Sequence, residues 1–267
     1  MKASTSIVTP TDLNNRIAAD LSLRCEQVER TVSLLQDEAT VPFIARYRKE
    51  ITGNLDEEAI RRIAEGHKYY QDLEQRRATI LATIAEQGKL TEELRWQIAT
   101  CFDKAELEDL YLPYRPKRRT KASIAIECGL EPLAHFIWEQ QPGDRSIEEI
   151  AATLVDPEKG ITNPDEALAG AGHIVAEWIA ERANLRKTLR TVMFNEGLIR
   201  STVVQGKVGQ KTKFQDYYDF SESTTSIPSH RMLAILRGVR EEVLSFNIEI
   251  DIDESLALIQ QELIHPS

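Results

Sequence analysis

Cysteine is scarce in this sequence, and long apolar runs are missing. The three cysteines, Cys25, Cys101 and Cys128, stand far apart and form no Cys-x-x-Cys pair, so neither a disulfide framework nor a zinc site is indicated. We expect each thiol to pack as a small hydrophobe in a reducing compartment. No window approaches 18 apolar residues, and Met1–Ser6 has no apolar run behind it, so we expect neither a membrane span nor a signal peptide. The predicted location is the cytoplasm.

The sequence also lacks the motifs of common catalytic sites. Gly206-Lys-Val-Gly209 has neither the spacing nor the strand-to-helix context of a phosphate-binding loop. The five histidines are widely separated and form no metal-binding pair. Acidic pairs such as Glu92-Glu93 and Glu148-Glu149 fall in the first turns of predicted helices, where they favour the helix dipole. We therefore expect no enzyme activity, no cofactor and no bound metal.

The patterns that are present are mostly helical, within an ordinary globular composition of 42% apolar and 28% charged residues. Asn54 followed by Glu57 predicts the start of a long helix over Leu55–Gln87. Its polar middle, Glu65–Arg77, is expected to face solvent or a partner. Ser146-x-x-Glu149 is a capping box, and Asn163-Pro164-Asp-Glu166 is an equally clear helix start.

One segment near the C-terminal end has the period of a strand. Apolar residues at 244, 246, 248 and 250 alternate with polar ones, which predicts a strand within Glu242–Asp251. Arg200–Ser226 loses the helical period and is interpreted as a loop with a short helix. A lone strand is unstable, so we expect this one to pair partly with chain outside the sequence. The predicted fold class is mainly α, with one or two short β-strands near the C-terminal end.

These patterns divide the chain into four predicted segments. Residues 1–113 form an N-terminal helical unit that includes the long helix, and residues 114–121 form a basic connector. Residues 122–240 form a second helical unit. Residues 241–267 supply a strand and a helix that lead into a downstream domain.

The basic connector stands out in a chain of net charge -10. It carries five cations within seven residues, and no acid falls between Asp109 and Glu127. Pro113 and Pro116 break the helical pattern, while Tyr111 and Tyr114 offer rings for base stacking. Cations neutralise phosphates and aromatic rings stack on bases. The predicted nucleic-acid-binding residues are Tyr114, Arg115, Lys117, Arg118, Arg119 and Lys121.

The alternative is a structural connector whose cations pair with acids on neighbouring helices. Composition alone favours neither interpretation, because short basic segments are only suggestive. Exposure distinguishes them: five free cationic groups favour nucleic acid, and five ion-paired ones favour a scaffold. A weaker basic group, Arg46, Arg48 and Lys49, is interpreted as a solvated helix face.

Several long blocks carry a family resemblance. Val41–Glu57 resembles a hallmark of the bacterial Tex proteins, the transcription accessory family, and Asp109–Lys121 followed by Gly129–Ala134 is similar to a second. Tyr217–Ser221 and Ser226–Arg231 match a third. These blocks occur in order over nearly the whole chain.

The resemblance implies an N-terminal helical region with helix-turn-helix-like elements, followed in a longer protein by a YqgF domain, helix-hairpin-helix motifs and an OB-fold RNA-binding domain. Our hypothesis is a helical scaffold of a transcription accessory protein that makes an auxiliary contact with RNA or DNA through the basic connector. The alternative is a protein-interaction scaffold that docks on RNA polymerase or on other domains without touching nucleic acid. No membrane partner is expected.

Overall fold

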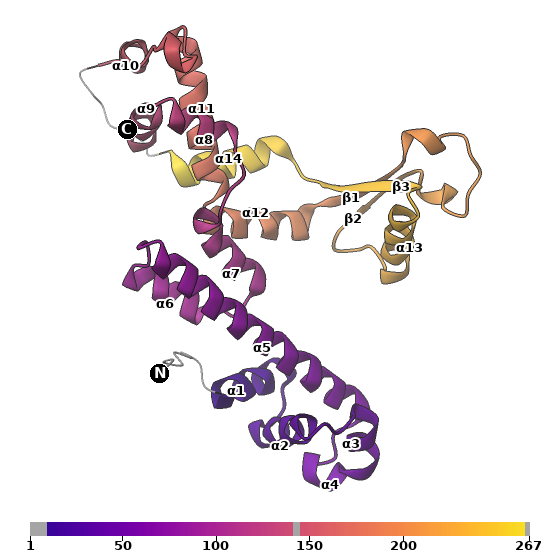
Figure 1. The fold of residues 1–267 in the computed structure, drawn as a ribbon. Helices are drawn as coiled ribbons and strands as arrows, with labels where there is room; N and C mark the ends of the chain where they lie inside the picture. Colours follow the sequence, from indigo (N-terminus) through magenta and orange to yellow (C-terminus); the bar gives the residue numbers. More distant parts are fainter. Residues whose placement is uncertain (1–9, 141–144, 265–267) are drawn as a thin grey trace. The chain divides into compact units, whose positions relative to one another are not determined.

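The computed structural model describes residues 10–140 and 145–264 (Figure 1). The chain divides into two compact units, separated in sequence between Arg115 and Pro116. This division falls inside the predicted connector, whereas the other predicted segment boundaries stay predictions. Residues 1–9, on which the expectation of no signal peptide depends, lie outside the described residues.

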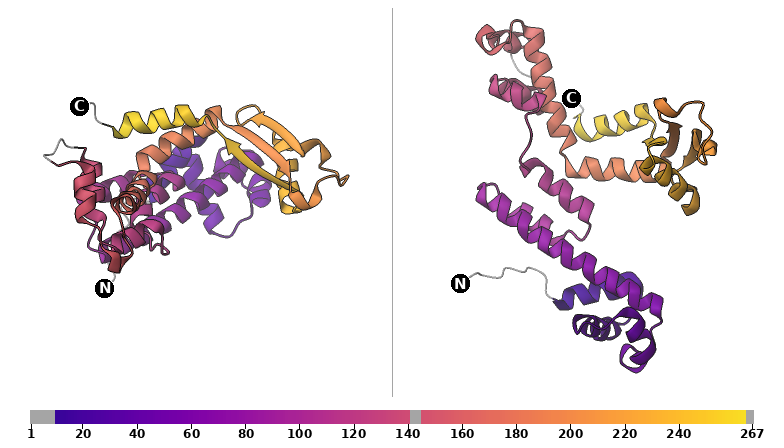
Figure 2. Two further views of the ribbon diagram at one scale, coloured as in Figure 1. Left: turned by 90° about the horizontal axis from the view of Figure 1, so that it is seen from above. Right: turned by 45° about the vertical axis from the view of Figure 1, so that its right-hand side comes forward.

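The first unit is built along one long helix, α5. Helices α1, α2 and α3 contact it, as do α6 and α7, and Figure 2 shows α1 to α4 gathered near its N-terminal end, with α6 toward its C-terminal end. The elements are α1 (Pro10–Leu21), α2 (Cys25–Gln36), α3 (Val41–Tyr47), α4 (Lys49–Thr52), α5 (Glu57–Glu86), α6 (Glu92–Thr100), α7 (Lys104–Tyr111) and the 3-10 turn η1 (Leu112–Tyr114).

The predicted long helix is present but begins two residues later than expected. Asp56 is its N-cap, and its carboxylate accepts a hydrogen bond from the Ala59 amide at 2.7 Å. Gly53 and Asn54 both have positive φ, so they end α4 rather than start α5. A glycine tolerates this left-handed conformation at little cost, which makes it a good helix stop.

The prediction that Glu65–Arg77 faces solvent or a partner is wrong for one face of α5. Tyr70, Leu73 and Arg77 are buried there, in line with Ile63 before them and Ile80 after them. Their spacing of three, four and seven residues places them on one side of the helix. One side of this stretch therefore belongs to the core of the first unit. Its overall composition is polar because most of its other residues lie on the outer side of the helix.

The second unit contains a helical cluster and a small sheet. In the cluster, α11 contacts α8, α9 and α10. The predicted helix starts are confirmed: Ser146 forms a capping box with Glu149, and Asn163 caps α11. The elements are α8 (Lys121–Glu127), α9 (Glu131–Glu139), α10 (Ile147–Thr153), η2 (Pro157–Lys159), α11 (Pro164–Ala180), α12 (Ala183–Glu196), β1 (Leu198–Val203), η3 (Gln205–Lys207), η4 (Gln215–Tyr217), β2 (Asp219–Ser223), α13 (Ser229–Arg240), β3 (Leu244–Glu249) and α14 (Ile252–Leu263).

The sheet is antiparallel, with strand order β2-β1-β3. The predicted strand is confirmed as β3, and it pairs with β1. The expectation that it also pairs partly with chain outside the sequence stays a prediction, since β3 lies at the edge of the sheet. The stretch interpreted as a loop holds both β1 and β2. Strand β1 was not predicted because a polar residue, Ser201, occupies one of its buried positions. The Ser201 hydroxyl donates a hydrogen bond to the Tyr217 carbonyl at 2.9 Å.

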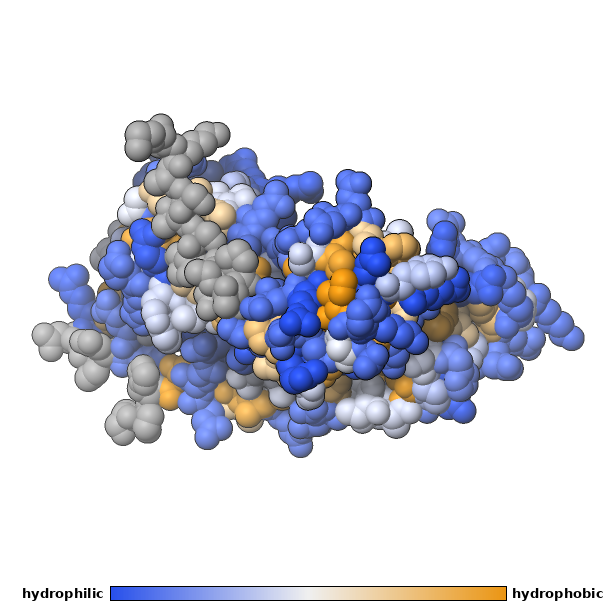
Figure 3. All heavy atoms as spheres, turned by 90° about the horizontal axis from the view of Figure 1, so that it is seen from below, coloured by the Kyte–Doolittle hydropathy of each residue, from blue (hydrophilic) through white to orange (hydrophobic). Residues whose placement is uncertain are grey.

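Helix α13 packs against β3, where Gly238 lies against the side chain of Leu244. The fold is thus mainly α with a small sheet near the C-terminal end, as predicted. No helix in the described ranges combines the length and the apolar character that crossing a membrane requires. The surface in Figure 3 is largely hydrophilic, with hydrophobic residues confined to small areas.

Candidate nucleic-acid interface

The predicted connector is held at both ends by local structure. On the N-terminal side, α7 passes into η1, which contains Pro113 and ends at Tyr114. On the C-terminal side, the Thr120 hydroxyl accepts a hydrogen bond from the Ser123 amide, and the Ser123 hydroxyl accepts one from the Thr120 amide, so the two residues cap α8. Residues 115–120 lie in neither helix nor strand.

The tyrosines beside the connector belong to the first unit. Tyr111 is buried and lies under the Arg76 guanidinium, 5.1 Å from the ring centre, so the expectation that its ring is open to bases is wrong. Tyr114 is half-buried against the same hydrophobic core. Its carbonyl accepts a hydrogen bond from the Gln87 side-chain amide at 2.9 Å. Both residues therefore help to fix the end of α7.

Two of the five cations form ion pairs. The Lys117 ammonium contacts the carboxylates of Glu177, at 2.8 Å, and Glu181, both near the end of α11. Burial acts to lower the pKa of Lys117, but the hydrogen bonds to the two carboxylates outweigh it and raise the pKa. Arg119 pairs with Glu127 at 3.0 Å, with both side chains well exposed. Lys117 thereby joins the connector to the end of α11 within the second unit. The Arg119 pair is exposed to solvent and therefore weak.

The other three cations, Arg115, Arg118 and Lys121, are exposed. Within residues 10–140 and 145–264, none of them lies within ion-pair distance of a carboxylate. Arg115 still acts at longer range on Glu108, whose pKa is lowered chiefly by its hydrogen bond to Arg76 and in smaller part by the Arg115 charge. The connector therefore matches neither predicted pattern in full: two cations are ion-paired, and three are exposed without an ion-pair partner among the described residues.

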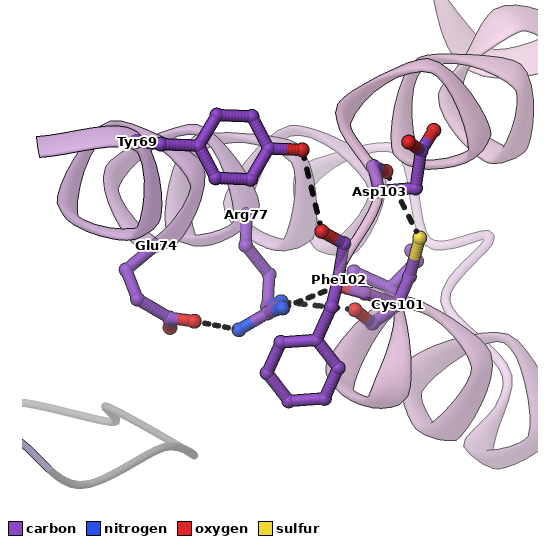
Figure 4. Close-up of polar contacts among 7 residues, drawn as sticks. Tyr69, Glu74, Arg77, Cys101, Phe102 and Asp103 are labelled. Carbon is purple, nitrogen blue, oxygen red and sulfur yellow. Dashed lines mark hydrogen bonds and ion pairs between the residues drawn. The ribbon is translucent and has the colours of Figure 1, made fainter. Parts of the chain in front are cut away.

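Sequence reasoning missed the polar network that joins α5 to the end of α6 (Figure 4). Arg77 is only 2% exposed. Its guanidinium donates to the Ile98 carbonyl at 3.0 Å and to the Cys101 carbonyl, and it pairs with Glu74. The sequence could have indicated this burial through spacing, because Arg77 follows Leu73 by four residues and so lies on the same buried face of α5. These bonds satisfy carbonyl groups left open where α6 ends.

His67 is a second polar residue that sequence reasoning did not single out. Both of its ring nitrogens are buried and lack a hydrogen-bond partner among the described residues. It lines a hollow of about 600 Å³ together with residues of α1, α2 and α5, including Glu29 and Asp72. Burial lowers the pKa of this imidazole. The described residues contain no group of three His, Cys, Asp or Glu side chains arranged to hold a metal ion.

Fold and site together define a helical scaffold that carries a small antiparallel sheet and an exposed cationic connector. Two family models match it: the Tex-like protein N-terminal domain over residues 11–85, and the Tex central region-like model over residues 143–265. The chain belongs to the Tex family, as the resemblance of its sequence blocks implied.

Curated relatives agree with this assignment. The chain is 46% identical to the transcriptional accessory protein Tex of Neisseria gonorrhoeae over 92% of its own length and 32% of the relative. It is 44% identical to the protein tex of Bordetella pertussis, over 94% and 31% of the two lengths. The human S1 RNA-binding domain-containing protein 1 is 30% identical, over 82% and 22%. The chain thus spans about a third of the length of its bacterial relatives.

Proposed function

We propose that this chain is a helical scaffold of a transcription accessory protein and that it makes an auxiliary contact with RNA or DNA through Arg115, Arg118 and Lys121. The observation that carries the proposal is the exposure of these three cations, without a carboxylate partner among the described residues, in a chain of net charge -10. The printed names of the relatives, one a transcriptional accessory protein and one an S1 RNA-binding domain-containing protein, support the ligand class.

The chemistry of the connector suits a phosphate backbone. Guanidinium and ammonium groups neutralise phosphates and release counterions, and such contacts carry little sequence information. Pro113 and Pro116 restrict the backbone, so less conformational entropy is lost when the segment binds. Of the six predicted residues, Lys117 holds the connector against α11, and Arg119 forms only a weak, exposed ion pair with Glu127. Tyr114 packs against the core of the first unit. The role is binding rather than catalysis, and the cytoplasmic location expected from the cysteines fits it.

A protein-docking scaffold is the second candidate function. It is favoured by the ion pairs of Lys117 and by the burial of Tyr111, because these two residues stabilise the chain and are not available to a ligand. Contact with RNA polymerase and the helix-turn-helix-like elements, both implied by the family resemblance, stay predictions.

Replacing Arg115, Arg118 and Lys121 by alanine tests the proposal. The matched control replaces three ion-paired surface cations, Arg95, Lys159 and Arg237, so that the net charge changes equally. Fluorescence anisotropy with a single-stranded RNA and a duplex DNA measures the affinity of each variant at low salt. We expect the connector variant to lose about tenfold or more for both ligands, since three phosphate contacts are removed.

The control is expected to lose about twofold at most, through the change in overall charge alone. Equal losses in the two variants would contradict a local contact at the connector. An unaltered chain that binds neither ligand would favour the docking scaffold instead.

A further inference from the structure

Helix α3 exposes two aromatic rings that form a pair on its surface. Phe43 is 40% exposed and Tyr47 is 62% exposed, and their ring centres lie 5.3 Å apart. The Arg48 guanidinium lies over the Phe43 ring, 5.3 Å from its centre. Ile44 and Ala45, between the two rings in sequence, are buried in the core. The helix is therefore anchored by its inner face, and its rings are held toward solvent.

Three cations accompany these rings, and none is neutralised locally. Arg46, Arg48 and Lys49 form no ion pair with any described carboxylate, although Glu50 follows directly in the sequence. Some other arginines of this unit are ion-paired, as Arg61 is with Glu57 at 3.0 Å and Arg30 with Glu26. The end of α3 thus places three cations, none ion-paired among the described residues, beside two exposed rings.

Exposed aromatic rings leave apolar surface in contact with water, which is unfavourable. A helix that only needed a solvated outer face would carry polar residues at positions 43 and 47, which are one turn apart. Exposed rings accompanied by cations are the combination that binds unpaired bases, because ring faces and guanidinium groups stack on bases and the cations follow the phosphates.

We propose that Phe43, Arg46, Tyr47, Arg48 and Lys49, here called the α3 patch, bind single-stranded nucleic acid by stacking on its bases. A duplex hides its base faces, so the patch favours single strands over duplexes. The proposal shares its ligand class with the proposed function but stands on different residues. Nucleic-acid binding through the connector can therefore be disproved while binding through the α3 patch stands, and the reverse also holds.

The test replaces the two rings without removing a charge. Phe43→Leu with Tyr47→Leu keeps apolar side chains but removes the flat faces, while Tyr47→Phe alone keeps both rings and reports on the loss of the hydroxyl. The matched controls are Trp96→Leu and Phe194→Leu, at aromatic residues that are 67% and 68% exposed. The ligands are an oligoadenylate RNA and a DNA duplex of equal length, and circular dichroism verifies that each variant is folded.

We expect the double leucine variant to bind the oligoadenylate at least about fivefold more weakly, from the loss of base stacking. Its affinity for the duplex and its salt dependence should be unchanged, since no cation is lost. Tyr47→Phe and both controls should bind as the unaltered chain does. The connector variant is expected to show the opposite pattern, with a changed salt dependence and losses for both ligands, so the two proposals can be contradicted separately.

Unchanged oligoadenylate affinity in the folded double variant would overturn the proposal. So would an equal loss in Trp96→Leu, which would indicate a general effect of surface aromatics. A polyglutamate peptide that binds the chain through the same two rings, when oligoadenylate does not bind at all, would overturn it in favour of an acidic protein partner.

Discussion

At the scale of single residues, Arg77 shows how a buried cation can serve structure alone. Its guanidinium is almost fully enclosed, yet its donors reach the carbonyls of Ile98 and Cys101 and the carboxylate of Glu74. The Phe102 ring lies 5.5 Å from it. Burying a charge is costly unless it is paired and hydrogen-bonded, and here both conditions hold. Arg77 thereby ties the end of α6 to the middle of α5.

Arg77→Met is expected to destabilise the protein by about 3 to 5 kcal/mol, because it removes the Arg77 donor from the Cys101 carbonyl and the buried pair with Glu74, and one of two donors from the Ile98 carbonyl. Arg76→Met is the matched control: its pair with Glu108 is about one-third exposed, so its loss should cost about 1 kcal/mol or less. Urea unfolding followed by circular dichroism measures both. Equal costs for the two substitutions would show that burial of the Arg77 network contributes nothing extra.

His67 has the opposite character, since its buried ring nitrogens lack partners among the described residues. Burial lowers the pKa of the folded-state imidazole below the ordinary value of 6.5. Below pH 6.5 the unfolded chain therefore binds more protons at this residue than the folded chain does. Unfolding is then favoured, and stability is lost as the pH falls from about 6.5.

His67→Leu should remove this component of the pH dependence. The difference in unfolding free energy between variant and unaltered chain should shift in favour of the variant between pH 7 and pH 5. Unfolding at pH 8, where the imidazole is neutral in both states, gives the reference difference. A difference that stays constant from pH 8 to pH 5 would mean that His67 is not held neutral in the fold.

At the scale of elements, helix packing depends on close approach at particular positions. A Cβ added at Gly170 of α11 would lie 2.3 Å from the Cδ1 atom of Leu130, which is itself only 1% exposed. A Cβ added at Gly172, two residues further on, would meet nothing within 4 Å. The two glycines share a helix but differ in what faces them.

Gly170→Ala is expected to destabilise the protein by about 1 to 3 kcal/mol, because Leu130 has no room to yield in the packed core. Gly172→Ala should instead stabilise it by about 0.5 to 1 kcal/mol, since alanine is the better helix former. Thermal and urea unfolding of the two variants compare them directly. The packing argument fails if both substitutions change stability in the same direction.

The same scale shows which features the sequence could predict. The helix starts at Ser146 and Asn163 were predictable because a cap depends on residues only three positions apart. Strand β1 was not, because Ser201 is polar but buried, which removes the alternation that marks a strand. The buried face of α5 was hidden likewise, since a polar residue such as Arg77 occupies a core position.

The candidate site divides in a similar way. The cluster of cations was visible in composition, but their partners were not, because Lys117 pairs with Glu177, 60 residues further along the chain. No local pattern reports such a pair. The exposure of the α3 rings was not predictable for a related reason: the sequence does not show that Phe43 and Tyr47 lie outside the core while Ile44 and Ala45 lie inside it.

At the scale of the whole molecule, each of the two units has its own hydrophobic clusters. The first cluster draws only on residues before Arg115, and the other two draw only on residues after Pro116. The connector, residues 114–121, therefore lies at the sequence boundary between the two units. Its free cations are the feature that an acidic chain would need for contact with a polyanion.

The central claim is that Arg115, Arg118 and Lys121 contact phosphates, and the salt dependence of binding tests it most directly. The affinity for single-stranded RNA is measured over a sodium chloride series for the unaltered chain and for the triple alanine variant. The plot of log affinity against log salt should become shallower by about 2 in the variant, at about 0.7 for each lost phosphate contact. An identical slope for the two proteins would contradict the claim.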